Sequence, residues 1–259
     1  MKVSSHPLSD TAKGIALAVQ DFTYLALRAI GNLWKKPSYW PDTLVQMDII
    51  GVGSLPIALL TGFFTGAVLA LQTFKILTKY GQISMTGELV ALSLVKELGP
   101  TLTSLMVAGR NSSGMASELG SMLVSEQIDA MRAMGTDPIK KLVTPRLVAT
   151  VTMLPLLTVL ADFVGLCGGF LVANFIIRLN PVEYWTNAYQ ALTWQDIFQG
   201  LLKPFVFAFI VALIGCFYGL RTKGGTQGVG RSTTQAMVAA SVLILTVNFF
   251  ITRLLLVVF

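Results

Sequence analysis

The chain is poor in the side chains that most catalytic and metal sites use. Its 259 residues include one histidine and two cysteines, Cys167 and Cys216. Both cysteines lie inside apolar stretches, so a disulfide framework is not expected. The histidine, His6, lies in a polar N-terminal segment and has no second histidine to join it in a metal site. We therefore expect no catalytic residue, no metal site and no cofactor in the chain itself.

Charge is also scarce. Charged residues make up 12% of the chain, about half the share of a soluble domain, while 54% are hydrophobic. A membrane-spanning helix needs ~20 mostly apolar residues, and several stretches reach that length. The composition predicts an all-α integral membrane protein with a single domain over residues 1–259. It excludes a chain of several soluble domains.

Five apolar stretches are long enough to cross a membrane. The predicted spans run roughly over residues 45–77, 89–108, 147–177, 197–220 and 236–259. Residues 11–40 precede them and are amphipathic, which predicts an interfacial elbow helix rather than a span. Its apolar residues at helical spacing are Ile15, Val19, Phe22, Leu25 and Ala29, and the anchors expected at headgroup level are Lys35, Lys36 and Trp40.

The basic residues predict the orientation. An odd number of spans puts the two ends of the chain on opposite sides of the membrane. If the N-terminus is cytoplasmic, most of the 19 lysines and arginines fall in cytoplasmic segments. The bias therefore predicts a cytoplasmic N-terminus and a periplasmic C-terminus. The same bias explains the net charge of +6, so we expect no nucleic-acid partner.

Residues 109–146 form the longest polar connection between two predicted spans. Within it, residues 122–135 are predicted to form a short helix, with Val124, Ile128 and Met131 on one face. Gly135 suits the end of that helix, and Pro138 follows it. Two interpretations are open: the helix docks a soluble partner, or it lies on the membrane surface.

Charged residues also fall within predicted spans, among them Lys96, Glu97, Asp162 and Lys203. Charge inside a membrane is costly and is often functional. These residues either form structural ion pairs between helices or face a polar cavity near a lipid headgroup. Lys96 and Glu97 are neighbours on a helix and point in different directions, so they cannot share one partner.

Glycines recur in two patterns. The pairs Gly62/Gly66, Gly165/Gly169 and Gly215/Gly219 have the spacing of close helix packing, which we expect mostly within the chain. Residues 225–232, GTQGVGRS, come close to a phosphate-binding loop but have arginine in place of lysine and no preceding strand. We expect a flexible turn there, with Ser232 or Thr233 capping the last helix. We therefore do not expect this segment to bind ATP.

Three motifs in order resemble one family. They are ALSL at 91–94 followed by KELGP at 96–100, AGR at 108–110 with ASELG at 116–120, and EQIDAMRAMGTDP at 126–138. The chain is similar over nearly its whole length to the MlaE family, the permeases of Mla and MCE-associated lipid ABC transporters. The likeness implies an elbow helix, five spans, a coupling helix that docks on an ATPase, and a homodimer in the bacterial inner membrane.

The resemblance also implies partners and sites. The partners are a second copy, a cytoplasmic ABC ATPase that binds ATP and Mg²⁺, a periplasmic MCE-domain protein and phospholipid. A small accessory protein associated with the ATPase is a further candidate. The implied coupling residues are Glu126, Ile128, Asp129, Met131, Arg132, Met134 and Gly135. A lipid needs an apolar wall and a few polar groups, for which the candidates are Leu69, Leu77, Tyr80, Glu97, Leu98 and Leu102.

Two positions depart from the family, since some members carry an acidic residue where this chain has Asn248 and a basic one where it has Gln46. An ion-pair network at those positions is therefore not expected here. Two other classes of function remain as alternatives. An ion-coupled secondary transporter would use the intramembrane lysines and glutamate and would show inverted repeats, which are not evident. A membrane enzyme of lipid metabolism would need a histidine or metal cluster.

Overall fold

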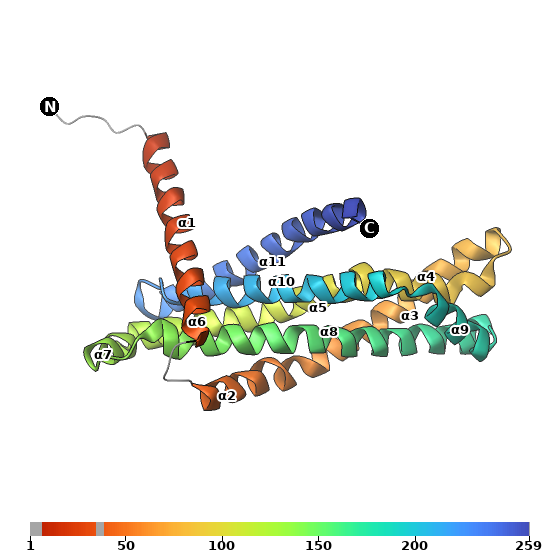
Figure 1. Cartoon of the computed structure of the whole chain (residues 1–259), viewed down its shortest axis with the longest axis horizontal. Helices are drawn as coiled ribbons and strands as arrows, with labels where there is room; N and C mark the ends of the chain where they lie inside the picture. Colours follow the sequence, from red (N-terminus) through yellow and green to blue (C-terminus); the bar gives the residue numbers. More distant parts are fainter. Residues whose placement is uncertain (1–6, 35–38, 259) are drawn as a thin grey trace.

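The computed structural model describes residues 7–34 and 39–258, and its regular structure there is helical (Figure 1). The α-helices are α1 Pro7–Gly31, α2 Trp40–Ile50, α3 Leu55–Lys79, α4 Thr86–Ser93, α5 Gly99–Val107, α6 Ser113–Val124, α7 Gln127–Ala133, α8 Thr144–Val172, α9 Pro181–Ala191, α10 Trp194–Gly219 and α11 Gly225–Val258. The short α7 lies at one end of an elongated bundle, and α9 lies at the other.

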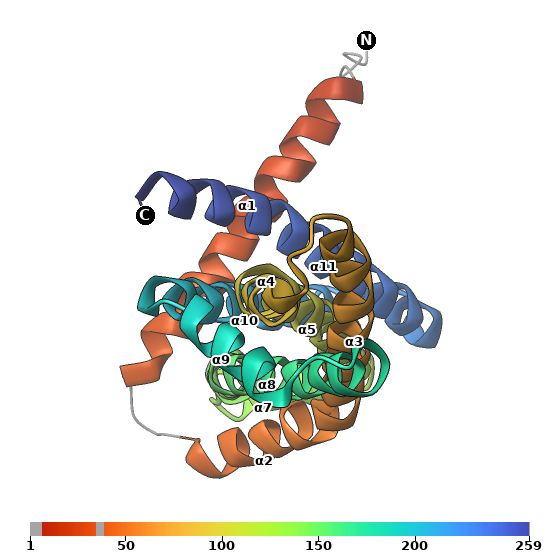
Figure 2. The ribbon, with the colours of Figure 1, turned by 90° about the vertical axis from the view of Figure 1, so that its right-hand side faces the viewer.

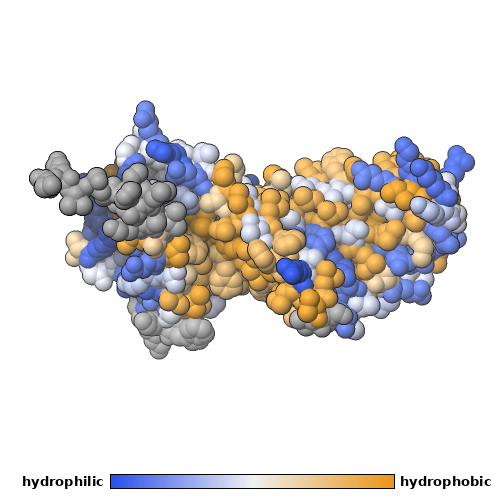
Figure 3. Space-filling model, turned by 90° about the horizontal axis from the view of Figure 1, so that it is seen from above, coloured by the Kyte–Doolittle hydropathy of each residue, from blue (hydrophilic) through white to orange (hydrophobic). Residues whose placement is uncertain are grey.

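Within the described residues, five helical runs are long and apolar enough to cross a membrane. They are Trp40–Lys79, Ile83–Val124, Ile139–Ile177, Trp194–Gly219 and Gly225–Val257. Figure 3 shows hydrophobic residues over the middle of the molecule and hydrophilic ones gathered toward both ends. The predicted number of five spans is therefore confirmed.

The second and fifth runs are longer than predicted. The second continues past Ala108 to Val124, because the polar residues predicted to end the span form hydrogen bonds inside the bundle. Asn111 Nδ2 donates to Ser54 Oγ at 3.2 Å, and Ser112 Oγ donates to the Val211 carbonyl at 2.9 Å. The polar connection predicted over residues 109–146 is correspondingly shorter.

Residues 225–232 do not form the predicted turn. They are the first turns of α11, and the chain reverses just before them, where Gly224 and Gly225 have positive φ. Glycine adopts such angles at little cost. The turn therefore lies at Gly224 and Gly225, at the very start of the segment predicted to form it. Ser232 lies inside the helix, where its Oγ accepts a hydrogen bond of 2.9 Å from Thr222.

The glycine pairs pack helices within the chain, as predicted. A Cβ added at Gly62 or Gly66 would collide with backbone of α8, at Ala161 and Gly165 respectively. A Cβ added at Gly215 of α10 would lie 3.0 Å from Ser112 Cα in the π-helical turn Ala108–Ser112, and one at Gly219 would lie 3.1 Å from Ala116 Cα in α6. The missing side chains let α3 lie directly on α8 and α10 on the second run.

Helix α1 projects from the side of the bundle near the α7 end (Figures 1 and 2). Leu25 and Ala29 are buried against the bundle and Phe22 is partly buried there, whereas Val19 is exposed. Part of its apolar surface therefore packs on the bundle, whereas Leu17 and Leu27 are exposed, and its interfacial role stays a prediction. Lys35 and Lys36 and the side chain of Ile15 lie outside the described residues.

Helix α9 was not predicted, because its 11 residues are short and mixed in polarity. Tyr184 is buried, and its hydroxyl donates to the Leu166 carbonyl at 3.2 Å. Asn187 Nδ2 donates to the Ser84 carbonyl at 2.7 Å. Helix α9 therefore closes the bundle at the end opposite α7.

Candidate functional site

The end of the bundle around α7 has an abrupt break in its helices. One helix was predicted over residues 122–135, but residues up to Val124 belong to α6 and only Gln127–Ala133 form α7. Between them, Glu126 adopts a left-handed conformation with φ of 59°. This conformation is unusual for a residue with a side chain, and it sets α7 apart from α6 as a separate short helix.

One face of α7 is held by the bundle and the other is free. Ile128 is fully buried in the core, and Met131 packs partly against the same cluster. Four predicted coupling residues, Glu126, Asp129, Arg132 and Met134, are exposed, as is Gly135. Arg132 and Asp129 pair across one turn at 2.9 Å. Of the predicted apolar face, Ile128 and Met131 therefore point into the bundle while Val124 is exposed, and the free face of α7 is mainly charged.

A hollow of about 420 Å³ separates α7 from α1, lined by Arg28, Arg132, Gly135, Thr136, Asp137, Pro138, Ile139 and Leu220. Arg28 Nη2 lies 3.1 Å from Asp137 Oδ2 across it. The other oxygen of Asp137 accepts a hydrogen bond of 3.0 Å from the Ile139 amide. This pair connects α1 to the segment that follows α7. No local pattern predicts the pair, because 109 positions separate the partners.

Lys96, Glu97 and Lys203 take part in two ion pairs. Lys96 Nζ lies 2.7 Å from Asp196 Oδ1, and Lys203 Nζ lies 2.7 Å from Glu97 Oε1. The prediction that Lys96 and Glu97 have different partners is confirmed. Asp196 was not predicted as the partner of Lys96, although it forms a capping box with Thr193 at the start of α10.

The second pair extends to α11. Thr252 Oγ1 donates to Glu97 Oε1 at 3.1 Å, and Asn248 Nδ2 lies 3.5 Å from Glu97 Oε2. Lys203 also donates to the Lys96 carbonyl at 2.8 Å. The neutral amide of Asn248 therefore acts as a hydrogen-bond donor to Glu97. An ionised acidic residue at position 248 could not donate. The pair joins three of the five spans.

The predicted lipid-cavity residues fall into two groups. Leu69 and Leu98 line one hollow of about 360 Å³ together with Phe64, Thr65, Val68 and Gln72. Leu98 also lines a smaller, deeper hollow with Leu102. Leu77 is instead buried, Tyr80 is 75% exposed at the end of α3, and Glu97 points toward α10 and α11. The structure therefore brings together Leu69, Leu98 and Leu102 but not the other three.

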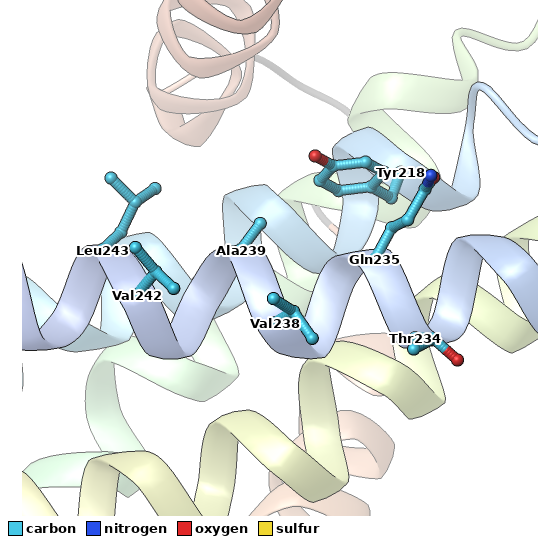
Figure 4. A pocket seen from close by; sticks show the side chains of 7 residues that line it. All are labelled: Tyr218, Thr234, Gln235, Val238, Ala239, Val242 and Leu243. Carbon is cyan, nitrogen blue, oxygen red and sulfur yellow. The ribbon is translucent and has the colours of Figure 1, made fainter.

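A further open hollow, of about 500 Å³, runs along α11 beside the end of α10 (Figure 4). Its lining is Tyr218, Thr234, Gln235, Val238, Ala239, Val242 and Leu243. It was not predicted, since its residues are spread along one long helix without a charged or aromatic cluster. Among the described residues, no group of three histidine, cysteine or acidic side chains is placed to hold a metal ion.

Comparison with known proteins agrees with this architecture. The family profile described as Permease MlaE matches residues 43–254. A probable ABC transporter permease of Rickettsia typhi is 41% identical over 240 residues, 93% of each chain. One of Synechocystis is 42% identical over 213 residues, 82% of this chain and 81% of the relative. The intermembrane phospholipid transport system permease MlaE of Haemophilus influenzae is 35% identical over 228 residues, 86% of this chain and 87% of the relative.

Proposed function

The chain belongs to the MlaE permease family, and we propose that it is the permease subunit of an ATP-driven transporter that moves phospholipid. In this proposal the lipid passes between the inner membrane and a periplasmic MCE-domain protein, which helps to maintain outer-membrane lipid asymmetry. The chain provides the membrane path, and a separate ATPase provides the energy. Relatives are named as permeases of ABC transporters, and the one from Haemophilus influenzae as a phospholipid transport permease.

The observation that carries the proposal is the way α7 is held. A coupling element must transmit force, so it needs a rigid attachment on one side and a free surface on the other. Ile128 supplies the attachment in the core, and Glu126, Asp129 and Arg132 lie on the free surface. We propose that the ATPase docks on this charged surface, with Met134 at its edge. The Arg28–Asp137 pair supports transmission of the movement to α1.

The lipid path is proposed at the hollow between α3 and the π-helical turn Leu94–Leu98. Phe64, Val68, Leu69 and Leu98 give it an apolar wall, while Thr65 and Gln72 add polar groups. This combination suits acyl chains with a headgroup nearby. In a homodimer, the same hollow of a second copy would face it and enlarge the cavity.

The orientation proposed from the basic residues places α7 in the cytoplasm. The N-terminus is then cytoplasmic, the C-terminus periplasmic, and the α9 end faces the MCE-domain protein. The docking of the ATPase and of the MCE protein would thus occur at opposite ends of the bundle (Figure 1).

The docking surface can be tested by charge reversal on purified complexes. Glu126→Lys combined with Asp129→Lys should release the ATPase while leaving the permease in the membrane, because both side chains are exposed. Glu183→Lys, an exposed residue of α9 at the opposite end, is the matched control and should retain the ATPase. Full retention of the ATPase with unchanged, permease-stimulated ATP hydrolysis in the double variant would contradict the proposed docking.

A further inference from the structure

One intramembrane acid has no part in the ion pairs described above. Asp162 lies within α8, and its Oδ1 is enclosed without a hydrogen-bond partner. Its carboxyl group rests against Gly99 of α5, where any added Cβ would collide with it. The glycine thus makes room for a carboxyl group at a place where the bundle is otherwise closely packed. A buried polar atom without a partner is uncommon and calls for an explanation.

The carboxyl group borders the smaller hollow, whose volume of about 10 Å³ is close to that of one enclosed water. Three threonines line the hollow with it: Thr61 and Thr65 from α3, and Thr103 from α5. Threonines elsewhere in the spans, such as Thr150 and Thr158, donate to the carbonyl four residues earlier. None of the hydrogen bonds found among the described residues involves the three hydroxyls around Asp162, so they are available to a group inside the hollow.

Among the residues that the structure describes, no basic side chain lines the hollow beside Asp162. The hollow is lined by Thr61, Gly62, Thr65, Leu94, Leu98, Gly99, Leu102, Thr103, Ala161 and Asp162, and only the last can ionise. On the adjoining π-helical turn, Lys96 and Glu97 are engaged with Asp196 and Lys203. An isolated carboxylate in such a setting carries a large desolvation penalty, which protonation removes. A protonated carboxyl group can then donate to a neighbouring hydroxyl or to an enclosed water.

The small hollow shares two walls with the larger one. Thr65 and Leu98 line both, so the carboxyl group of Asp162 lies directly behind the surface proposed to hold lipid. We propose that Asp162, with the hydroxyls of Thr61, Thr65 and Thr103, is an intramembrane proton-binding site whose protonation is linked to occupancy of the larger hollow. The proton site stands on the geometry alone, whereas the linkage rests on the proposed function.

Infrared difference spectroscopy on the purified permease–ATPase complex in phospholipid vesicles tests the site directly. The wild-type complex should show the carbonyl stretch of a protonated carboxylic acid at neutral pH. Asp162→Asn should lose that band, while the control Glu183→Gln, an exposed carboxyl group outside the spans, should keep it. Absence of the band from the wild type, or its persistence in Asp162→Asn, would overturn the proposal.

A second variant and the addition of phospholipid complete the test. Should Asp162→Asn fail to assemble, Thr103→Val takes its place, because loss of a neighbouring hydroxyl should shift the band; an unshifted band would overturn the site. For the linkage, the band should move when phospholipid is added to delipidated complex, and an unmoved band would reject the linkage. A complex that shows the band but moves no lipid would reject the proposed function while leaving the proton site standing.

Discussion

The ammonium group of Lys203 lies 2.7 Å from the carboxylate of Glu97, and the two residues differ sharply in exposure. The lysine side chain is 1% exposed and the glutamate side chain 41%. Removing the glutamate would leave a buried ammonium group with only the Lys96 carbonyl, whereas removing the lysine would leave a carboxylate still bonded to Thr252. The pair is therefore asymmetric.

The first prediction follows from that asymmetry. Glu97→Leu should lower the unfolding free energy by roughly 3 kcal/mol, in the range for a broken buried pair. Lys203→Met should cost clearly less, and the double variant should recover much of the loss. Thermal unfolding of the purified permease in detergent measures all three. Equal losses in the two single variants would contradict the asymmetry, and additive losses in the double variant would show that the pair is not coupled.

The second prediction concerns the contact between α3 and α8. Gly66→Ala should destabilise the protein by about 1–3 kcal/mol, because the added methyl meets the Gly165 backbone and neither helix can yield. Gly114→Ala in α6 is the matched control, since nothing lies within 4 Å of an added Cβ there. The control should be neutral or stabilising by up to ~1 kcal/mol through helix propensity. Similar midpoints for both variants in thermal unfolding would refute the close contact.

The third prediction concerns orientation. A reporter that is active only in the cytoplasm, fused after Phe259, should give no signal if the chain crosses the membrane five times from a cytoplasmic N-terminus. The same reporter inserted after Gly135, beside α7, should be active. A strong signal from the C-terminal fusion would contradict the proposed orientation of the spans.

The five spans could be predicted because each contains a long apolar window, whatever it packs against. Their limits could not, because burial decides whether a polar residue ends a span. Their polarity predicts that Asn111 and Ser112 belong to a cytoplasmic connection. They instead donate hydrogen bonds to Ser54 and to the Val211 carbonyl inside the bundle. The break at Glu126 was equally hidden, since a left-handed glutamate leaves no trace in a hydrophobic pattern.

The same distinction applies to the candidate sites. Helical spacing indicated correctly that Lys96 and Glu97 would point to different partners, because neighbours on one helix diverge. Spacing could not show that Leu77 packs into the bundle, or that Arg28 meets Asp137, because those contacts depend on how separate helices lie together.

A photo-crosslinker at Leu69 or Leu98 measures lipid capture at the α3 hollow. Leu160 is the reference, because it is 43% exposed on α8 and lines neither the α3 hollow nor that of Figure 4. In membranes that contain the ATPase partner, both positions should capture phospholipid several-fold more than Leu160. Added ATP should change their capture but not that of Leu160. Equal capture at all three positions, unaffected by ATP, would refute the proposed lipid path.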